Sequence, residues 1–197
     1  MPYSRDTYKY IIDTIFAHVS FQNINILELG CGSGSFTRFL SERGNATITA
    51  VDISDNLLAI AKQKAKEVYF VQGYINHDFL TGLSLHKYDL ILSFCFLHHL
   101  SKEARTDIAA CLLKYMKKNA VFACFEPNRD NPSILFQYLY ETKLNKKDYD
   151  STEFPLSKYE LDELFPSKQV DTYYMDVVYA SPQIGRASCR ERVYIAV

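Results

Sequence analysis

ILELGCGSGSF, residues 26–36, decides the predicted fold. In this stretch an apolar run is followed by three glycines at alternate positions, Gly30, Gly32 and Gly34. A glycine-rich turn between a strand and the first turn of a helix exposes backbone N–H groups, and such groups bind anions. The stretch therefore predicts a strand, an anion-binding loop and a helix, in that order along the chain.

Short apolar strands and helical patterns alternate along the rest of the chain. Strands are expected at residues 25–29, 46–51, 68–71, 88–94, 120–125 and 170–179. Helices are expected within residues 1–22, after the glycine loop, after a cap at Ser54, after a cap at Ser101 and on to Met116, from Asn131 and Pro132, and after the capping box of Ser157 and Glu160. The alternation predicts an α/β protein with a Rossmann-like, doubly wound and mostly parallel sheet. Such sheets bind ligands beyond the carboxyl ends of their strands.

Composition and charge are those of an ordinary globular chain with one domain. The chain has 197 residues, of which 48% are hydrophobic, and a formal net charge of -1. It shows no strong charge of one sign, no apolar span and no signal-peptide core, so we expect a cytoplasmic protein with no nucleic-acid partner and no membrane span. The five cysteines form no CxxC pair and the five histidines show no zinc-ligand spacing, so no metal site is expected. The sequence leaves the oligomeric state open.

The spacing of the glycines, and the acid before them, indicate which anion the loop binds. The dinucleotide fingerprint is G-x-G-x-x-G, and Ser35 stands at its last glycine position. Glu28, two residues before the first glycine, would repel a pyrophosphate in a poorly solvated cleft. A zwitterionic amino acid fits better, because its carboxylate can bind the loop amides while its ammonium is attracted by Glu28.

Five segments resemble those of the class I S-adenosylmethionine-dependent methyltransferases, in particular the bacterial members that act on small molecules. The segments are ELGCGSG at residues 28–34, VDIS at 51–54, YDLILS at 88–93, LHHL at 97–100 and FEPNRDNP at 125–132. The resemblance extends over nearly all of the chain before residue 183. The resemblance implies that the cofactor is S-adenosylmethionine.

The resemblance also implies cofactor contacts at positions of this sequence. Asp52 is expected to accept hydrogen bonds from both ribose hydroxyls, and Ile53 to lie against the adenine. Many members carry an acid after the third strand that contacts the adenine amino group; here Tyr74 stands near that place and Asp78 lies further on, so stacking by Tyr74 or backbone contacts could take over. The expected cofactor set is Glu28, Gly30, Cys31, Gly32, Gly34, Asp52, Ile53, Gly73, Tyr74, Ser93 and Phe94.

Methyl transfer from a sulfonium mainly requires that a nucleophile be held in line with the methyl group, so no catalytic residue is strictly required. A base helps when the acceptor is a hydroxyl, and His98 and His99 after the fourth strand are the candidates. Either histidine could instead pack or cap the following helix. Glu126, Asn128 and Arg129 are candidate substrate contacts, although Asn128 is also expected to stabilise a turn.

Three functions are compatible with these residues. The leading hypothesis is an enzyme that transfers a methyl group to a small-molecule acceptor by in-line displacement, beneath a lid formed by residues 131–155. The first alternative is a non-catalytic domain that binds S-adenosylmethionine and serves as a partner or regulatory subunit. The second is an NAD(P)-dependent oxidoreductase, which Ser35 and Glu28 disfavour. The acceptor and the methylated atom are not readable from the sequence.

Residues 183–197 differ from the rest of the chain. Within them IGRASCRERV, residues 184–193, resembles the translation of a short-read sequencing adapter. The chain before this tail has 14 Lys and 5 Arg, whereas the tail has three Arg and no Lys. We therefore expect one domain over residues 1–182, followed by a non-native tail. The resemblance implies a seventh, antiparallel strand beside the fifth, and truncation is expected to remove it.

Overall fold

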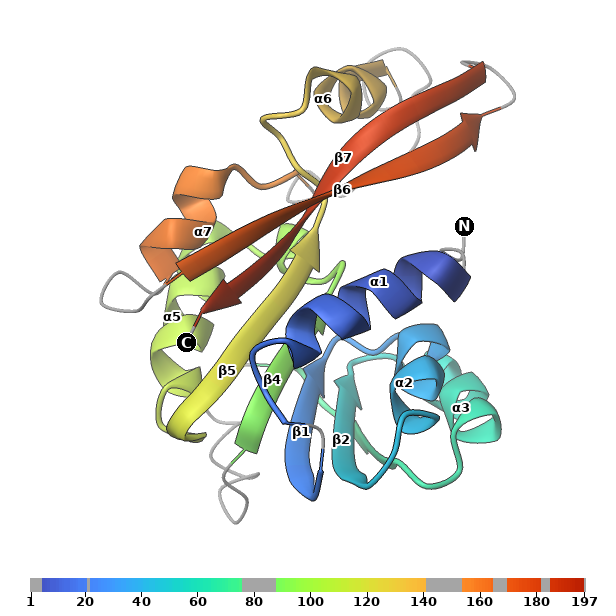
Figure 1. The fold of residues 1–197 in the computed structure, drawn as a ribbon, viewed down its shortest axis with the longest axis vertical. Helices are drawn as coiled ribbons and strands as arrows, with labels where there is room; N and C mark the ends of the chain where they lie inside the picture. The colour runs from blue at the N-terminus through green and yellow to red at the C-terminus, as the bar shows by residue number, and fades with distance from the viewer. Residues whose placement is uncertain are drawn as a thin grey trace.

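The computed structural model describes residues 5–20, 22–75, 88–140, 154–164, 170–181 and 185–196. Its strands are β1 (Ile24–Leu29), β2 (Ala46–Asp52), β3 (Tyr69–Gln72), β4 (Tyr88–Phe94), β5 (Met116–Glu126), β6 (Val170–Ser181) and β7 (Gly185–Ala196). They form one sheet in the order β3-β2-β1-β4-β5-β7-β6 (Figure 1). Strands β1 to β5 run parallel, and β7 is antiparallel to both of its neighbours. The predicted Rossmann-like sheet is confirmed.

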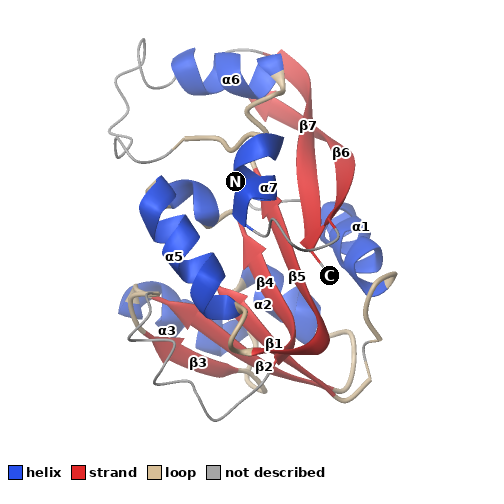
Figure 2. Ribbon diagram, turned by 90° about the vertical axis from the view of Figure 1, so that its left-hand side faces the viewer, coloured by secondary structure: helices blue, strands red, loops and turns tan. Residues whose placement is uncertain are grey.

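Helices cover both faces of the sheet. One face is covered by α1 (Arg5–Phe16), α2 (Ser35–Ser41) and α3 (Asp55–Lys64), and the other by α5 (Lys102–Leu112) and α7 (Lys158–Leu164). The 3-10 helix η1 (Leu97–His99) follows β4, and α6 (Pro132–Leu139) follows β5. Figure 2 shows α1 and α5 on opposite sides of the strands.

The strands are apolar almost throughout because each face has its own core. Ile26 of β1 packs in the core under α1, α2 and α3, whereas the next residue, Leu27, packs in the core under α5 and α7. Successive side chains of a strand point to opposite faces, so a sheet covered on both sides needs apolar residues at consecutive positions. This pattern agrees with the parallel sheet that the alternation of strands and helices predicted.

The caps confirm three predicted helix starts. The Ser54 hydroxyl accepts a hydrogen bond from an N–H group of α3 at 3.3 Å, and the Ser101 hydroxyl accepts one from α5 at 3.2 Å. Ser157 and Glu160 form the expected capping box: the Ser157 hydroxyl accepts from the Glu160 N–H at 3.2 Å, and Glu160 Oε2 accepts from the Ser157 N–H at 2.9 Å. These bonds satisfy N–H groups that have no partner inside the helix.

The helix α5 ends earlier than predicted. It stops at Leu112, and β5 already begins at Met116. The Tyr115 carbonyl accepts a hydrogen bond from the Tyr88 N–H at 2.8 Å, so a contact with the start of β4 replaces a further helical turn. The register between the two strands then shifts, and Asn119 takes a left-handed φ of 65°. Apolar spacing misled the prediction because strand residues can match a helical period over a single turn.

The seventh strand is present, so the prediction that it is missing was wrong. The strand β7 pairs with β5 from Phe122↔Ala196 to Glu126↔Arg192, and with β6 along its whole length. Ladder hydrogen bonds join main-chain groups, so the pairing itself requires few particular side chains. The non-native origin of this segment stays a prediction, as do the predicted domain boundaries.

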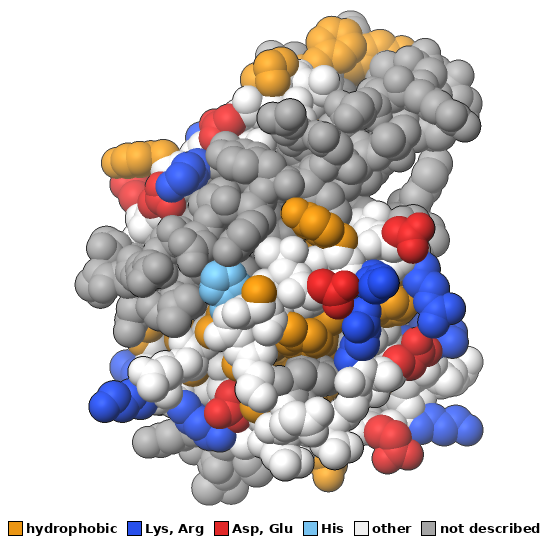
Figure 3. Space-filling model, in the orientation of Figure 1, with side chains coloured by type: hydrophobic (Ala, Val, Ile, Leu, Met, Phe, Trp, Pro, Cys, Tyr) orange, Lys and Arg blue, Asp and Glu red, His pale blue; other side chains and the backbone are white. Residues whose placement is uncertain are grey.

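Ion pairs and aromatic contacts hold α1 against α2. Arg43, just after α2, lies 3.3 Å from Asp13 of α1, and the ring centre of Tyr8 lies 5.6 Å from that of Phe36. On the face shown in Figure 3, positive and negative side chains are interspersed.

No described helix is both long and apolar enough to cross a membrane.

Candidate functional site

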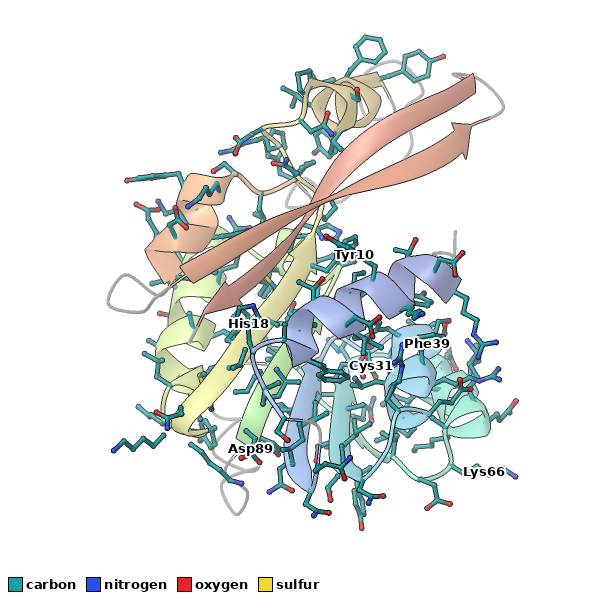
Figure 4. All side chains as sticks on the ribbon, in the orientation of Figure 1. Tyr10, His18, Cys31, Phe39, Lys66 and Asp89 are labelled. Carbon is teal, nitrogen blue, oxygen red and sulfur yellow. The ribbon has the colours of Figure 1, made fainter. Side chains whose placement is uncertain are left out.

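The candidate site lies along the carboxyl ends of β1, β2, β4 and β5. The order of the strands reverses between β1 and β4, and open α/β sheets bind ligands at such a switch point. In Figure 4, Cys31 marks this edge, in the loop after β1, whereas Asp89 lies at the opposite end of β4. Within the described ranges, no three His, Cys, Asp or Glu side chains gather as metal ligands.

The three glycines of the loop share a left-handed backbone but meet different surroundings. Their φ angles are 68° at Gly30, 52° at Gly32 and 72° at Gly34. A Cβ at Gly30 would lie 2.3 Å from the Phe96 ring, and one at Gly34 would lie 2.7 Å from the Ala61 Cβ. A Cβ at Gly32 would meet no described atom within 4 Å. Two of the glycines therefore permit close packing, whereas Gly32 leaves an open side where a ligand can approach the backbone.

Asp52, the last residue of β2, fastens the loop. Its Oδ2 accepts a hydrogen bond from the Gly32 N–H at 2.7 Å, and its Oδ1 accepts one from the Ser54 N–H at 2.9 Å. The Cys31 N–H donates to the Val51 carbonyl at 2.9 Å, so the loop is joined to β2 at two points. Each carboxylate oxygen can accept a second hydrogen bond, which leaves capacity for hydroxyl donors.

Glu28, near the end of β1, is a buried acid with an unsatisfied oxygen. Its side chain is 1% exposed, and Oε2 meets no hydrogen-bond donor among the described residues. Burial raises the pKa of this carboxyl to about 7; the Thr37 hydroxyl, close by but outside hydrogen-bonding geometry, opposes the rise, and the charge of Asp52 adds to it. Burial, Glu28 and Asp52 also raise the pKa of the Cys31 thiol, which therefore stays protonated. A buried carboxyl oxygen without a donor favours a cationic, hydrogen-bonding ligand.

Two large side chains are exposed beside the ends of β2 and β3. Ile53 is 61% exposed and Tyr74 is 55% exposed. Between them the Gly73 N–H donates to the Asp52 carbonyl at 3.0 Å, which joins the ends of the two strands. Exposed apolar and aromatic surfaces of this kind can receive a planar ring. Contact with an adenine at these positions stays a prediction, and Asp78 lies outside the described residues.

Glu126, the last residue of β5, organises the segment after β4. Its side chain is 1% exposed. Its Oε1 accepts hydrogen bonds from the Leu97 N–H at 2.8 Å, the Phe96 N–H at 3.1 Å and the Ser93 hydroxyl at 3.3 Å. These donors belong to the protein itself, so the position of Glu126 gives no support to the expected substrate contact.

Ser93 and Phe94, both expected at the cofactor, take part in internal contacts. Ser93 is 3% exposed and donates to Glu126. The Phe94 ring stacks on Phe36 with ring centres 4.7 Å apart and on Phe125 with centres 4.9 Å apart. These contacts fix the end of β4 between α2 and β5.

His98 lies beside the second oxygen of Glu126. Its Nδ1 is 2.7 Å from Glu126 Oε2, and its backbone N–H is 3.4 Å from the same oxygen. The His98 carbonyl accepts a hydrogen bond from the Phe154 N–H at 3.3 Å. His99 is exposed, and its ring centre lies 4.1 Å from that of His98. The structure thus gives one of the two candidate bases, His98, a buried carboxyl partner.

Asn128 and Arg129 both take part in contacts within the protein. Asn128 is 4% exposed, and its Oδ1 accepts a hydrogen bond from the Asp130 N–H at 3.0 Å, which forms the expected turn. The Arg129 guanidinium lies 2.8 Å from Glu160 Oε2 and 5.3 Å from the centre of the Phe154 ring. Its charge is therefore already paired. The part of the predicted lid between residues 141 and 153 lies outside the described residues.

Sequence reasoning missed Arg105, which stabilises the same segment from α5. Arg105 is 7% exposed, and its guanidinium donates to the Leu100 carbonyl at 2.8 Å and lies 3.5 Å from Glu160 Oε1. A signal was present in the sequence. Arg105 occupies the same helix face as the buried residues Ile108 and Leu112, and a charged residue on an apolar face needs a polar partner.

A comparison with protein families agrees with this location of the site. Residues 26–119 match a methyltransferase domain. The matched range contains the glycine loop, Asp52 and His98, and it ends before Glu126. The methyltransferase match therefore includes most of the carboxyl edge described above.

Similar proteins are also methyltransferases. The malonyl-[acyl-carrier protein] O-methyltransferase of Priestia megaterium (strain DSM 319 / IMG 1521) is 42% identical over 76 residues, which are 36% of this chain and 26% of that protein. The ribosomal RNA small subunit methyltransferase A of Mesomycoplasma hyopneumoniae (strain 232) is 36% identical over 72 residues, 36% of this chain and 27% of that protein. The chain thus spans about a quarter of the length of these curated relatives.

A solved structure shares the fold. The magnesium protoporphyrin IX methyltransferase of Synechocystis PCC 6803 with bound SAH superposes with a TM-score of 0.71 at 15% identity, over 98% of this chain and 81% of that chain. At this identity the likeness shows the fold alone.

Proposed function

We propose that this chain binds S-adenosylmethionine and transfers its methyl group to a small-molecule acceptor. The observation that carries the proposal is the buried Glu28 carboxyl, whose Oε2 meets no donor among the described residues, in the strand that leads to the open side of Gly32. The ammonium of an amino acid would supply the missing donor and a compensating charge. The domain match over residues 26–119 supports the same ligand.

Each part of this cofactor finds residues of suitable chemistry. The N–H groups of Cys31, Gly32 and Gly34 already donate within the protein, so the carboxylate would meet the loop at its other N–H groups. Glu28 suits the ammonium, and the remaining acceptor capacity of Asp52 suits the ribose hydroxyls. The exposed side chains of Ile53 and Tyr74 suit the adenine. When bound, S-adenosylmethionine supplies a methyl group that its sulfonium makes electrophilic. The chain binds and orients the two reactants, and orientation can account for roughly 7–11 kcal/mol of a barrier.

A small molecule is the acceptor class that the charge distribution favours. The formal net charge is -1, and the face in Figure 3 interleaves both signs, whereas a nucleic-acid backbone is bound by a surface rich in Lys and Arg. The name of the Priestia megaterium relative suggests a malonyl thioester as the first acceptor to test. The ribosomal RNA methyltransferase relative makes an RNA substrate a necessary second arm of the same assay.

Calorimetric titration with S-adenosylmethionine, S-adenosylhomocysteine and NAD tests the ligand. We expect the first two to bind and NAD to bind much more weakly. Glu28→Gln should weaken S-adenosylmethionine binding about tenfold or more, because a hydrogen bond to a charged group contributes about 1.5–3 kcal/mol. Glu67→Gln makes the same chemical change at an exposed position and should bind like the original protein. Tighter binding of NAD, or equal affinity in Glu28→Gln, would refute the assignment.

Transfer of a labelled methyl group then separates an enzyme from a binding domain. The full chain is incubated with labelled S-adenosylmethionine and, in separate arms, a malonyl thioester, small alcohols, phenols, amines and thiols, and a short RNA. Label in one of the small molecules supports the proposal. Label in the RNA arm overturns the acceptor class, and cofactor binding without transfer in any arm favours the non-catalytic alternative.

A further inference from the structure

We infer that Glu126 positions His98 as the general base of the proposed methyl transfer, by keeping the proton of the neutral ring on Nδ1 and leaving Nε2 free to accept one. The inference rests on the proposed function and adds the division of roles between these two side chains. His98 is the catalytic residue, and Glu126 acts through it.

The contact between the two side chains is short, and the Glu126 carboxyl is buried. Nδ1 and Oε2 are 2.7 Å apart, with side-chain exposures of 15% for His98 and 1% for Glu126. A carboxylate at this distance favours a proton on the facing nitrogen, because a charge-assisted hydrogen bond is roughly twice as strong as a neutral one. The two ring nitrogens lie on different sides of the imidazole, so Nε2 is directed away from Glu126.

Glu126 is itself fixed by other donors. The N–H groups of Phe96 and Leu97 donate to Oε1, and a quarter turn of the carboxyl would leave both without an acceptor, whereas half a turn only exchanges its two equivalent oxygens. Buried N–H groups that lose an acceptor cost about 1–3 kcal/mol each, so the carboxyl is held in one orientation. A rigid carboxyl sets both the tautomer and the ring plane of His98.

The backbone around His98 is held by separate hydrogen bonds. The Phe154 N–H donates to the His98 carbonyl at 3.3 Å, and Arg105 donates to the Leu97 and Leu100 carbonyls at 3.4 and 2.8 Å. Other ionisable groups near the pair include His99, whose ring lies against that of His98, Arg105 of α5 and Glu160 of α7. Cys124 of β5 is another, and burial and the charge of Glu126 raise the pKa of its thiol. Burial lowers the pKa of Arg105, while the charges of Glu160 and Glu126 raise it, so Arg105 stays a cation that balances both acids.

The proposed step is a proton transfer coupled to methylation. The proton of an acceptor hydroxyl moves to Nε2, and the oxygen keeps the electron pair of the O–H bond. That oxygen bonds to the methyl carbon, while the electron pair of the carbon–sulfur bond stays on sulfur. The imidazolium that forms is stabilised by the carboxylate of Glu126 at Nδ1, and no further reactant is needed.

Histidine ring NMR of the ¹⁵N-labelled full chain tests the tautomer without any acceptor. Long-range ¹H–¹⁵N correlations at pH 8 should show His98 with its proton on Nδ1, and His98→Gln identifies these signals by removing them. Glu126→Gln should shift the ring toward the Nε2–H form, whereas Glu67→Gln should leave it unchanged. An Nε2–H ring in the original protein overturns the inference, even if Glu126→Gln fails to fold. So does an unchanged ring in a folded Glu126→Gln.

Kinetics provide a second readout with the alcohol or phenol that accepts label. Label in the malonyl thioester alone overturns the inference, because its ionised carboxyl has no proton for His98 to accept. Glu126→Gln should lower kcat about 10²-fold and alter the acidic limb of the pH profile, because the base is no longer held in its accepting form. Calorimetric affinity for S-adenosylmethionine should change by less than about twofold. Unchanged kcat and pH profile in a folded variant overturn the role of Glu126 alone. Failure of the original protein to bind S-adenosylmethionine overturns the proposed function instead.

Discussion

Replacing Glu28 by glutamine should stabilise the cofactor-free protein above neutral pH. The carboxyl is 1% exposed, and its Oε2 meets no donor among the described residues. Burial raises its pKa in the folded protein, the Thr37 hydroxyl lowers it and the charge of Asp52 raises it further. The resulting pKa is about 7, against 4.5 for the free side chain. Glutamine has a similar shape and no charge, so it avoids the cost of burying a carboxylate.

The magnitude follows from the shift in pKa. A rise of about 2.5 units, from 4.5 to about 7, corresponds to about 3 kcal/mol at roughly 1.36 kcal/mol per unit. The folded state binds this proton more tightly than the unfolded chain, so the contribution of Glu28 to the free energy of unfolding falls as pH rises from about 4.5 to about 7. Glu28→Gln lacks this fall. The free energy of unfolding of Glu28→Gln should therefore exceed that of the original protein by an amount that grows between about pH 4.5 and pH 7 and levels off at about 3 kcal/mol, or roughly 6–12 °C in Tm.

Urea denaturation of both proteins at intervals from pH 5 to pH 8 measures this difference. Glu67→Gln controls for the loss of a carboxyl as such, because Glu67 is exposed. Saturating S-adenosylmethionine should reduce the difference in stability at pH 8 by about 1.5–3 kcal/mol, since the bound ammonium compensates the charge only when Glu28 is present. Parallel stability curves for Glu28→Gln and the original protein would show that the buried charge is already compensated, and the reasoning about the ligand would fail with it.

Other substitutions test the loop and the helix ends. Gly34→Ala should lower the free energy of unfolding by about 2–4 kcal/mol, because it combines a left-handed φ with a Cβ 2.7 Å from that of Ala61. Gly32→Ala should lower it by only about 1–2 kcal/mol and should mainly weaken cofactor binding. Urea denaturation measures the stabilities and calorimetry the binding, and equal stabilities would contradict the packing difference. Ser101→Ala should lower stability by about 1 kcal/mol through loss of the α5 cap, and a Tm unchanged within error would count against it. Glu160→Ala should lower the free energy of unfolding by about 2–4 kcal/mol, more than Ser101→Ala, because it breaks a capping box and leaves Arg105 and Arg129 without their acid. A smaller loss of stability than in Ser101→Ala would be inconsistent with these contacts.

The sequence was sufficient for the strands β1 to β6 and for the loop because both follow local rules. The apolar run at residues 88–94 coincides with β4, and the Ser54, Ser101 and Ser157 caps lie where the patterns place them. The predicted end of α5 failed because a contact with β4, distant in sequence, decided it. The prediction that the seventh strand is missing failed for a related reason, since main-chain pairing is not encoded in a side-chain pattern.

The candidate site was predicted by position more than by role. Glu126 was found as an acid at the end of a strand, but its partners are N–H groups about 30 residues earlier, and no local pattern reports them. Asp52 was found as well, yet its bonds to Gly32 and Ser54 were not foreseen. Residue identity indicates what a side chain can bind, whereas the partner it meets depends on how distant segments come together.

The strand β7 follows β6 along the chain, yet it lies between β5 and β6. While the chain is still on the ribosome, β6 emerges before the strand that pairs with it exists, and the outer edge of β5 stays open for the same interval. Open edges of this kind can pair with other nascent chains, and closure by a distant segment is slow. Aggregation during synthesis should therefore depend on how quickly the codons for β7 are translated.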